Sequence, residues 1–217
     1  MIIDCISDLH GFYPQLEGGD LLIVAGDLTA TDTKQEFEKF VSWLYNQKYN
    51  KIIVIAGNHD NVLKYDDNLL LFFSGGKIEY LCDSGTEFEG LTIWGSPWTP
   101  WFHGVNPKCK AFTVDTEEEL AEKFALIPSN TNILITHSPP YMRFDETEKG
   151  ESVGSTSLDE KVFYLSKLQL HVFGHVHECG GRIDHRTRNA SDKHISVNAS
   201  YVNERYQPVN KPIRVNI

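Results

Sequence analysis

The sequence lacks the features typical of secreted, disulfide-bonded or membrane-spanning proteins. Its 217 residues include four scattered cysteines and no C-x-x-C pair, so neither a disulfide framework nor a structural zinc site is expected. The first residues show no positively charged segment followed by a long apolar stretch, as a secretory signal would. No run approaches the ~20 apolar residues that span a bilayer. We therefore expect a cytoplasmic protein that has no membrane partner.

Positive charge is scarce as well. Lysine and arginine together number 20 against 30 aspartates and glutamates, which gives a formal net charge of -10. A protein that follows a nucleic-acid backbone ordinarily carries an excess of positive charge. Extended nucleic acid is therefore not an expected partner. A small phosphorylated substrate is compatible with the acidity, because bound metal ions can dominate the field locally. The sequence predicts no oligomeric state.

The sequence does contain short apolar runs that alternate with helical patterns. Runs typical of strands buried on both faces occupy residues 2–6, 21–25, 52–56, 133–135 and 170–173. Helical patterns begin at capping-box sequences near Thr33, Thr116 and Ser157. Residues 77–97 are predicted to form consecutive strands, and residues 139–157 a long surface loop of the kind that is often functional. This order predicts one α/β domain with two sheets over residues 1–217.

Each of these apolar runs ends in a polar sequence. The five endings are D-L-H-G, G-D, G-N-H-D, T-H and G-H-V-H, in chain order. Ligands of open α/β sheets bind just beyond the carboxyl ends of the strands, so these endings are expected to meet at one crevice. The residues concerned are Asp8, His10, Asp27, Asn58, His59, His137, His175 and His177.

The composition of this set predicts a pair of divalent metal ions. Imidazole nitrogens with carboxylate and amide oxygens, and no thiolate, suit Mn²⁺, Fe²⁺, Ni²⁺ or Zn²⁺. The donors outnumber what one catalytic ion with an open position would take, whereas two ions bridged by a carboxylate would use them fully. One such motif alone is a weak signal, but five in order, each after an apolar run, are a strong one.

These motifs, in this order, resemble those of the calcineurin-like metallophosphoesterase superfamily over residues 8–177. V-N-A-S at 197–200 and Y-Q-P-V-N-K-P-I at 206–213 are similar to the end of the MPPED-type phosphodiesterase branch. The same holds for W-T-P-W-F at 98–102 and H-S-P-P at 137–140. The resemblance implies a four-layer α/β/β/α sandwich of two mixed sheets flanked by helices.

The family pattern also implies a role for each residue of the set. One metal ion would be bound by Asp8, His10 and His177, the other by Asn58, His137 and His175, and both by Asp27. Mn²⁺ is the expected metal. His59 would donate a proton to the leaving oxygen or a hydrogen bond to the phosphoryl group. Leu-Thr-Ala follows Asp27 in place of the G-D-x-x-D-R signature of protein Ser/Thr phosphatases, which disfavours a phosphoprotein substrate.

The implied activity is hydrolysis of small, cyclic-nucleotide-like phosphodiesters. Two divalent ions, two carboxylates and a bridging hydroxide leave roughly one net positive charge when the histidines are neutral, which attracts a diester anion. The metal-bridged hydroxide would attack phosphorus in line with the leaving oxygen, with no covalent enzyme intermediate. The alternatives are a nuclease or phosphomonoesterase with the same centre, and a non-catalytic protein-binding scaffold of the same fold.

Two features of the sequence each allow two interpretations. Asp60 either caps the helix that follows it or orients His59. The aromatic side chains either form a base-stacking wall or pack in the core beneath a loop. These are Trp94, Trp98, Trp101 and Phe102.

Overall fold

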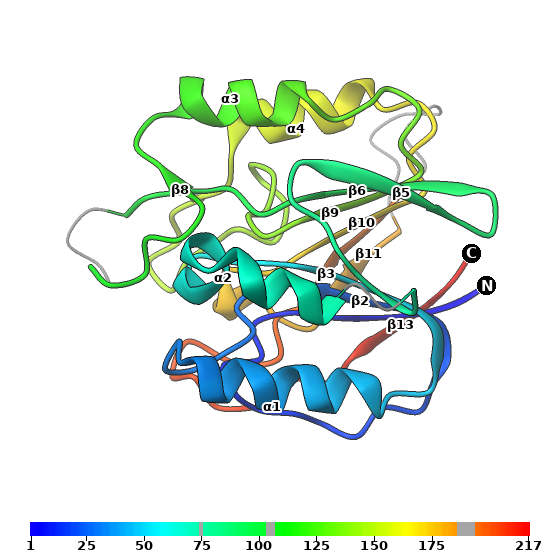
Figure 1. Cartoon of the computed structure of the whole chain (residues 1–217). Helices are drawn as coiled ribbons and strands as arrows, with labels where there is room; N and C mark the ends of the chain where they lie inside the picture. Colours follow the sequence, from blue (N-terminus) through cyan, green and yellow to red (C-terminus); the bar gives the residue numbers. More distant parts are fainter. Residues whose placement is uncertain (74–75, 103–106, 186–193) are drawn as a thin grey trace.

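Two β-sheets lie face to face, and helices cover their outer faces (Figure 1). The structure, a computed structural model, describes residues 1–73, 76–102, 107–185 and 194–217. Helices α1 and α2 lie against one sheet, and α3 and α4 lie against the other on the opposite side of the molecule. The predicted four-layer α/β/β/α sandwich is therefore confirmed.

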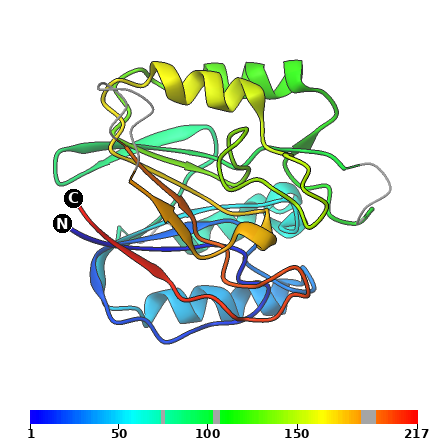
Figure 2. The same ribbon diagram turned by 180° about the vertical axis from the view of Figure 1, so that it is seen from behind.

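The first sheet has five strands in the order β13-β1-β2-β3-β4. Neighbours from β1 to β4 are parallel, and β13 pairs antiparallel with β1. Figure 2 shows β13 beside β1, so that the two ends of the chain lie close together. The strands are β1 (Ile2–Ile6), β2 (Gly19–Ala25), β3 (Tyr49–Ile55), β4 (Ile78–Tyr80) and β13 (Ile213–Asn216).

The second sheet has six strands in the order β11-β12-β10-β9-β6-β5, with β5 and β11 antiparallel to their neighbours. A short parallel pair, β7 (Thr99–Pro100) and β8 (Thr113–Val114), follows β6. The strands of the sheet are β5 (Ser84–Phe88), β6 (Leu91–Ser96), β9 (Ile133–Thr136), β10 (Leu170–Phe173), β11 (Arg182–Asp184) and β12 (Ile195–Asn198). The consecutive strands expected within residues 77–97 are β4, β5 and β6.

Alternation along the strands separates the apolar layers. In β2, Leu22 and Val24 pack beneath α1, whereas Leu21 and Ile23 face the other sheet. Successive side chains of a strand point to opposite faces, so a strand with apolar residues at every position is buried on both sides. The continuous apolar runs of the sequence follow from this position between two layers.

The helices are α1 (Lys34–Tyr45), α2 (Asn61–Tyr65), α3 (Glu117–Ala125) and α4 (Thr156–Tyr164), with 3₁₀ turns η1 (Asp67–Phe73) and η2 (His177–Cys179). Thr33 and Thr116 cap α1 and α3 as predicted. The predicted start of α4 is wrong by two residues. Ser155 is the cap, since its hydroxyl oxygen accepts the Leu158 N–H at 3.1 Å, and Glu117 of α3 accepts the N–H and the hydroxyl of Ser157 at 2.7 Å. Within the described ranges, no helix is long and apolar enough to cross a membrane.

Candidate metal centre

Five parallel strands bring the predicted residues together just beyond their carboxyl ends. The chain leaves each strand and places its polar residues within a few positions, which is where ligands of open α/β sheets bind. Asp8 and His10 follow β1, Asp27 follows β2, Asn58 and His59 follow β3, His137 follows β9, and His175 and His177 follow β10. The distances below show that all eight side chains belong to one cluster.

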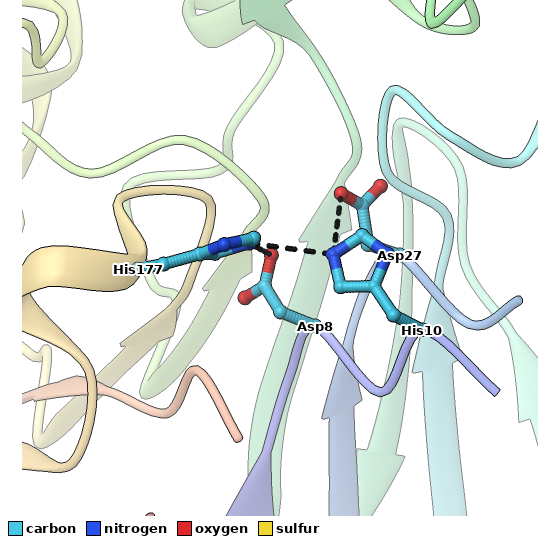
Figure 3. A group of neighbouring side chains, drawn as sticks. All are labelled: Asp8, His10, Asp27 and His177. Atoms are coloured by element: carbon cyan, nitrogen blue, oxygen red, sulfur yellow. Dashed lines mark hydrogen bonds and ion pairs between the residues drawn. The ribbon is translucent and has the colours of Figure 1, made fainter. Parts of the chain in front are cut away.

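One part of the cluster consists of Asp8, His10, Asp27 and His177, which come from three different strand ends (Figure 3). One donor atom from each of the four lies within 4.8 Å of the others. His177 Nε2 is 3.1 Å from Asp8 Oδ1 and 3.3 Å from His10 Nε2. His10 Nε2 is in turn 3.7 Å from Asp27 Oδ2. Carboxylate oxygens and imidazole nitrogens therefore converge on one point.

A second part of the cluster lies on the other side of the Asp27 carboxylate. His137 Nε2 is 3.4 Å from Asp27 Oδ1 and 3.1 Å from Asn58 Oδ1. The same amide oxygen is 3.1 Å from His175 Nδ1. Asp27 thus presents one oxygen to His10 and the other to His137. This is the arrangement expected of a carboxylate shared between two groups of donors.

The backbone at these positions is held in an uncommon conformation. Asp8, His10, Asp27 and His175 all have positive φ, between 41° and 68°. Left-handed backbone is rare for residues other than glycine and is maintained at functional sites by the surrounding structure. Gly26 has φ of 100°, and a Cβ there would lie 2.5 Å from His137 Nδ1. The sharp turns after the strands therefore come at a conformational cost, and they aim the side chains into the cluster.

Hydrogen bonds with neighbouring residues hold the possible metal-ligand side chains in place. Ser200 Oγ donates to Asp8 Oδ2 at 2.7 Å, and the His175 N–H donates to the same oxygen at 3.0 Å. The Ala25 carbonyl lies 2.9 Å from His137 Nδ1. With its Nδ1 N–H donated to this carbonyl, the ring turns Nε2 toward the cluster, and Nε2 can bind a metal ion once it has lost its proton, as in many metal-binding histidines.

Asp60 has a role that neither sequence interpretation foresaw. Its side chain makes no capping bond to α2. It accepts the Gly57 N–H at 2.7 Å and the Leu28 N–H at 3.0 Å, while it is 1% exposed. Asp60 therefore ties the turn after β3 to the turn after β2, which are the turns that carry Asn58 and Asp27.

Burial and mutual charge set the protonation of these groups. Burial would raise the pKa of Asp27, but His137 and His59 outweigh it and hold that pKa well below its usual value. Burial lowers the pKa of His10 to about 4, so its ring is neutral at physiological pH. Burial also lowers the pKa of His137, but Asp27 and Asp8 outweigh it and raise that pKa to about 9.

The donor set fits divalent metal ions. A carboxylate shared by two groups, an amide oxygen, imidazole nitrogens and no thiolate match the ligands of borderline divalent metals. His177 Nε2 lies 3.1 Å from Asp8 Oδ1 and 3.3 Å from His10 Nε2, and the contact between the two ring nitrogens is a hydrogen bond only if one of the rings donates a proton. A cation at their centre would satisfy all of them at once.

The ring nitrogens of His59 lie farther from the other atoms of the cluster than those of the other four histidines, whose closest contacts are 3.1–3.3 Å. His59 Nε2 lies 3.8 Å from Asp27 Oδ2, and the ring lines a cavity that opens beside the cluster. On the other side of the ring, Cys109 Sγ is 3.3 Å from Nδ1. Burial, then the charge of Asp27, raises the pKa of the Cys109 thiol to about 11, so it carries its proton. No sequence motif indicated this contact.

The aromatic residues divide between the two interpretations. Trp98 packs in the core, where its indole N–H donates to Asp83 at 2.7 Å, and Trp94 packs under α3 and α4. Trp101 and Phe102 line the cavity instead. Tyr206, which the sequence interpretation passed over as a site residue, also lines it.

Comparison with known proteins places the chain in a family. Residues 1–179 match the model of the calcineurin-like phosphoesterases. Metallophosphoesterase domain-containing protein 1 of Homo sapiens and that of Mus musculus are each 36% identical over 98% of this chain and 70% of their own length. A dimetal phosphatase structure from Danio rerio aligns at a TM-score of 0.46 and 9% identity, over 91% of this chain and 87% of its own. The chain belongs to the calcineurin-like phosphoesterase family, and the resemblance found in its motifs is confirmed.

Proposed function

We propose that this protein hydrolyses small phosphodiesters with the help of two divalent metal ions, for which Mn²⁺ is the best match. The position of Asp27 carries the proposal. Its two oxygens face two separate groups of nitrogen and oxygen donors, 3.7 Å from His10 on one side and 3.4 Å from His137 on the other. A buried carboxylate in that position suits the bridging ligand of a two-metal site.

The residues would divide as the family pattern implies. Asp8, His10 and His177 would hold one ion, Asn58, His137 and His175 the other, and Asp27 both. When bound, such ions supply a Lewis acid that offsets phosphoryl charge and lowers the pKa of water from 15.7 to about 7. Fe²⁺, Ni²⁺ and Zn²⁺ suit the same donors, so a metal titration decides the native ion.

His59 would protonate the leaving oxygen. It lines the cavity without taking part in the closest donor contacts, and its Nδ1 faces the protonated Cys109 thiol. A thiol that donates to Nδ1 leaves the proton on Nε2, the nitrogen on the side of Asp27. The ring is therefore oriented to pass a proton into the cavity, which is what a general acid needs.

The distinction between diester and monoester can be tested directly. Protein reconstituted with Mn²⁺ should cleave bis(p-nitrophenyl) phosphate faster than p-nitrophenyl phosphate, and a chelator should abolish both activities. Asp27→Ala should lose metal from both sites, whereas the exposed Asp115→Asn should retain metal and activity. A clear preference for the monoester would favour a phosphomonoesterase, and no turnover with any divalent metal would favour the scaffold.

The role of His59 has its own test. His59→Asn should keep its metal content and lose ~10²–10⁴ in kcat for substrates with an alkoxide leaving group. The loss should be much smaller for p-nitrophenolate, which departs without protonation. The exposed His185→Asn serves as a control and should behave as the unmodified protein. An equal loss for both leaving groups would refute proton donation, and a loss of metal would make His59 a ligand.

A further inference from the structure

The cavity beside the metal centre has an unusual balance of charge. It encloses about 350 Å³ and is bounded on one side by Asp27, His59 and the histidines that follow β10. The rest of its wall combines aromatic and acidic side chains. No lysine or arginine is found among the described residues that line it. A cavity for several phosphate groups would need cations in these positions.

One aromatic wall is Tyr206, which is fixed against the centre. Its ring lies 4.8 Å from the ring of His10 and 5.2 Å from that of His177. The loop that carries it is closed by Asn203, whose side-chain oxygen accepts the Gln207 N–H at 2.9 Å and whose carbonyl accepts the Tyr206 N–H at 2.8 Å. The position of the ring is therefore set by the fold.

A second aromatic part of the wall is formed by Trp101 and Phe102. Phe102 stacks on His175 with ring centroids 5.8 Å apart and 21° between the planes. Lys110 lies over the Trp101 ring at 4.3 Å, but Lys110 itself does not line the cavity. Aromatic faces thus flank the cavity next to both halves of the metal centre.

Three glutamates complete the outer wall, and they come from three separate segments. Glu151 belongs to the loop between β9 and α4, Glu178 follows His177, and Glu204 lies on the loop of Tyr206. Glu204 pairs with Arg205, whose side chain is 76% exposed. Glu151 and Glu178 have no ion-pair partner among the parts of the chain that the structure describes. Within the described ranges, two carboxylates without an ion-pair partner therefore line the cavity that the second arm of a diester would enter.

We propose that the outer cavity recognises a cationic arm of the diester, such as an alkylammonium or quaternary ammonium alcohol, and excludes a second phosphate. The inference rests on the proposed function, because the metal centre would hold the phosphoryl group. Aromatic faces attract quaternary ammonium groups, and carboxylates add direct charge attraction. The same carboxylates repel any further anion. Cyclic nucleotides meet the single-phosphate requirement, but their bases carry no positive charge for the carboxylates to attract.

The sharpest test compares two substrates that differ only in charge. Glycerophosphocholine carries a quaternary ammonium arm, and its 3,3-dimethylbutyl analogue has carbon in place of that nitrogen. With Mn²⁺-loaded protein, kcat/KM should favour the choline ester by about tenfold, the effect of one unit charge ~6 Å away at an effective dielectric constant of ~40. Because the carboxylates repel a second phosphate, adenosine 2′,3′-cyclic phosphate should be cleaved faster than its 5′-phosphorylated form.

Variants connect this preference to the cavity. Glu151→Gln and Glu178→Gln should each reduce the ratio of choline ester to neutral analogue several-fold. The exposed Glu122→Gln on α3, outside the cavity, should leave the ratio unchanged. If diesters are hydrolysed but the ratio is near one, or does not respond to either glutamate, the inference is overturned while the proposed function stands. If no diester is hydrolysed with any metal, the proposed function itself fails. Faster cleavage of cyclic nucleotides than of the choline ester would overturn the cationic arm in favour of a stacked nucleobase.

Discussion

Replacing Gly174 with alanine should separate the metal centre from the stability of the fold. A Cβ at Gly174 would lie 2.1 Å from Asp8 Oδ2 and 2.2 Å from Ser7 Oγ, more than an ångström inside ordinary van der Waals contact. The Asp8 carboxylate cannot simply turn away, because Ser200 and the His175 N–H hold it. The φ of Gly174 is outside the left-handed range, so alanine suits the backbone and only the side-chain contact is disturbed.

The size of the effect follows from that overlap. Overpacking of this kind costs about 1–3 kcal/mol of unfolding free energy. Displacement of a buried ligand or its support weakens metal binding by about 10–100-fold. Urea denaturation of chelator-treated protein measures the first quantity, and Mn²⁺ titration measures the second. Activity at limiting Mn²⁺ should fall with metal affinity.

Gly90→Ala is a matched control for this variant. Gly90 lies in the β5–β6 turn with φ of 77°, and a Cβ added there would meet nothing within 4 Å. Alanine at this position therefore costs about 1–2 kcal/mol of backbone strain only. Both variants should lose similar stability, but only Gly174→Ala should lose metal. Normal Mn²⁺ affinity in Gly174→Ala would refute the argument that Asp8 is a tightly held ligand.

Three further predictions concern the surroundings of the centre. Asp60→Asn removes one acceptor of two buried N–H groups and should cost about 1–3 kcal/mol in urea denaturation; unchanged stability would contradict the link between the β2 and β3 turns. Cys109→Ala should lower kcat for alkoxide leaving groups by about 2–12-fold, and Cys109→Ser should retain most of the original kcat, because a hydroxyl can donate the same hydrogen bond to His59. Equal kcat values in the two variants would contradict a role of the thiol in orienting His59. The pKa of His137 is raised from 6.5 in the unfolded chain to about 9 in the folded protein, so this histidine contributes its full stabilisation of the chelator-treated protein below pH 6.5. That contribution should be lost as the pH rises through 9. Mn²⁺ binding at pH 7.5 should then release about one proton from this ring. Calorimetry in buffers of different ionisation enthalpy measures that proton, and a binding enthalpy that is the same in all buffers would contradict the raised pKa.

Much of the architecture could be predicted because its signals are local. A run such as Leu21–Ala25 is apolar at every position, and only a strand between two layers buries such a run on both faces. The capping residues Thr33 and Thr116 bind N–H groups three residues away, so they too can be recognised in sequence. The polar endings of β1, β2 and β3 lie at one edge of the first sheet, and those of β9 and β10 at one edge of the second, because parallel strands end on the same side of a sheet.

Contacts between distant segments had no such local signal. Cys109 and His59 are 50 residues apart, and the Asp60 carboxylate reaches Leu28 across 32. Ser155 rather than Ser157 caps α4, and Glu117 of another helix accepts hydrogen bonds from both serines. Tyr206 contacts the rings of His10 and His177 from a loop that Asn203 closes near the C-terminus. The sequence by itself therefore determined which side chains follow each strand, since that depends on neighbours along the chain. Only the tertiary structure decided which carboxylates, rings and thiol surround them, since those contacts depend on how the two sheets and their loops pack.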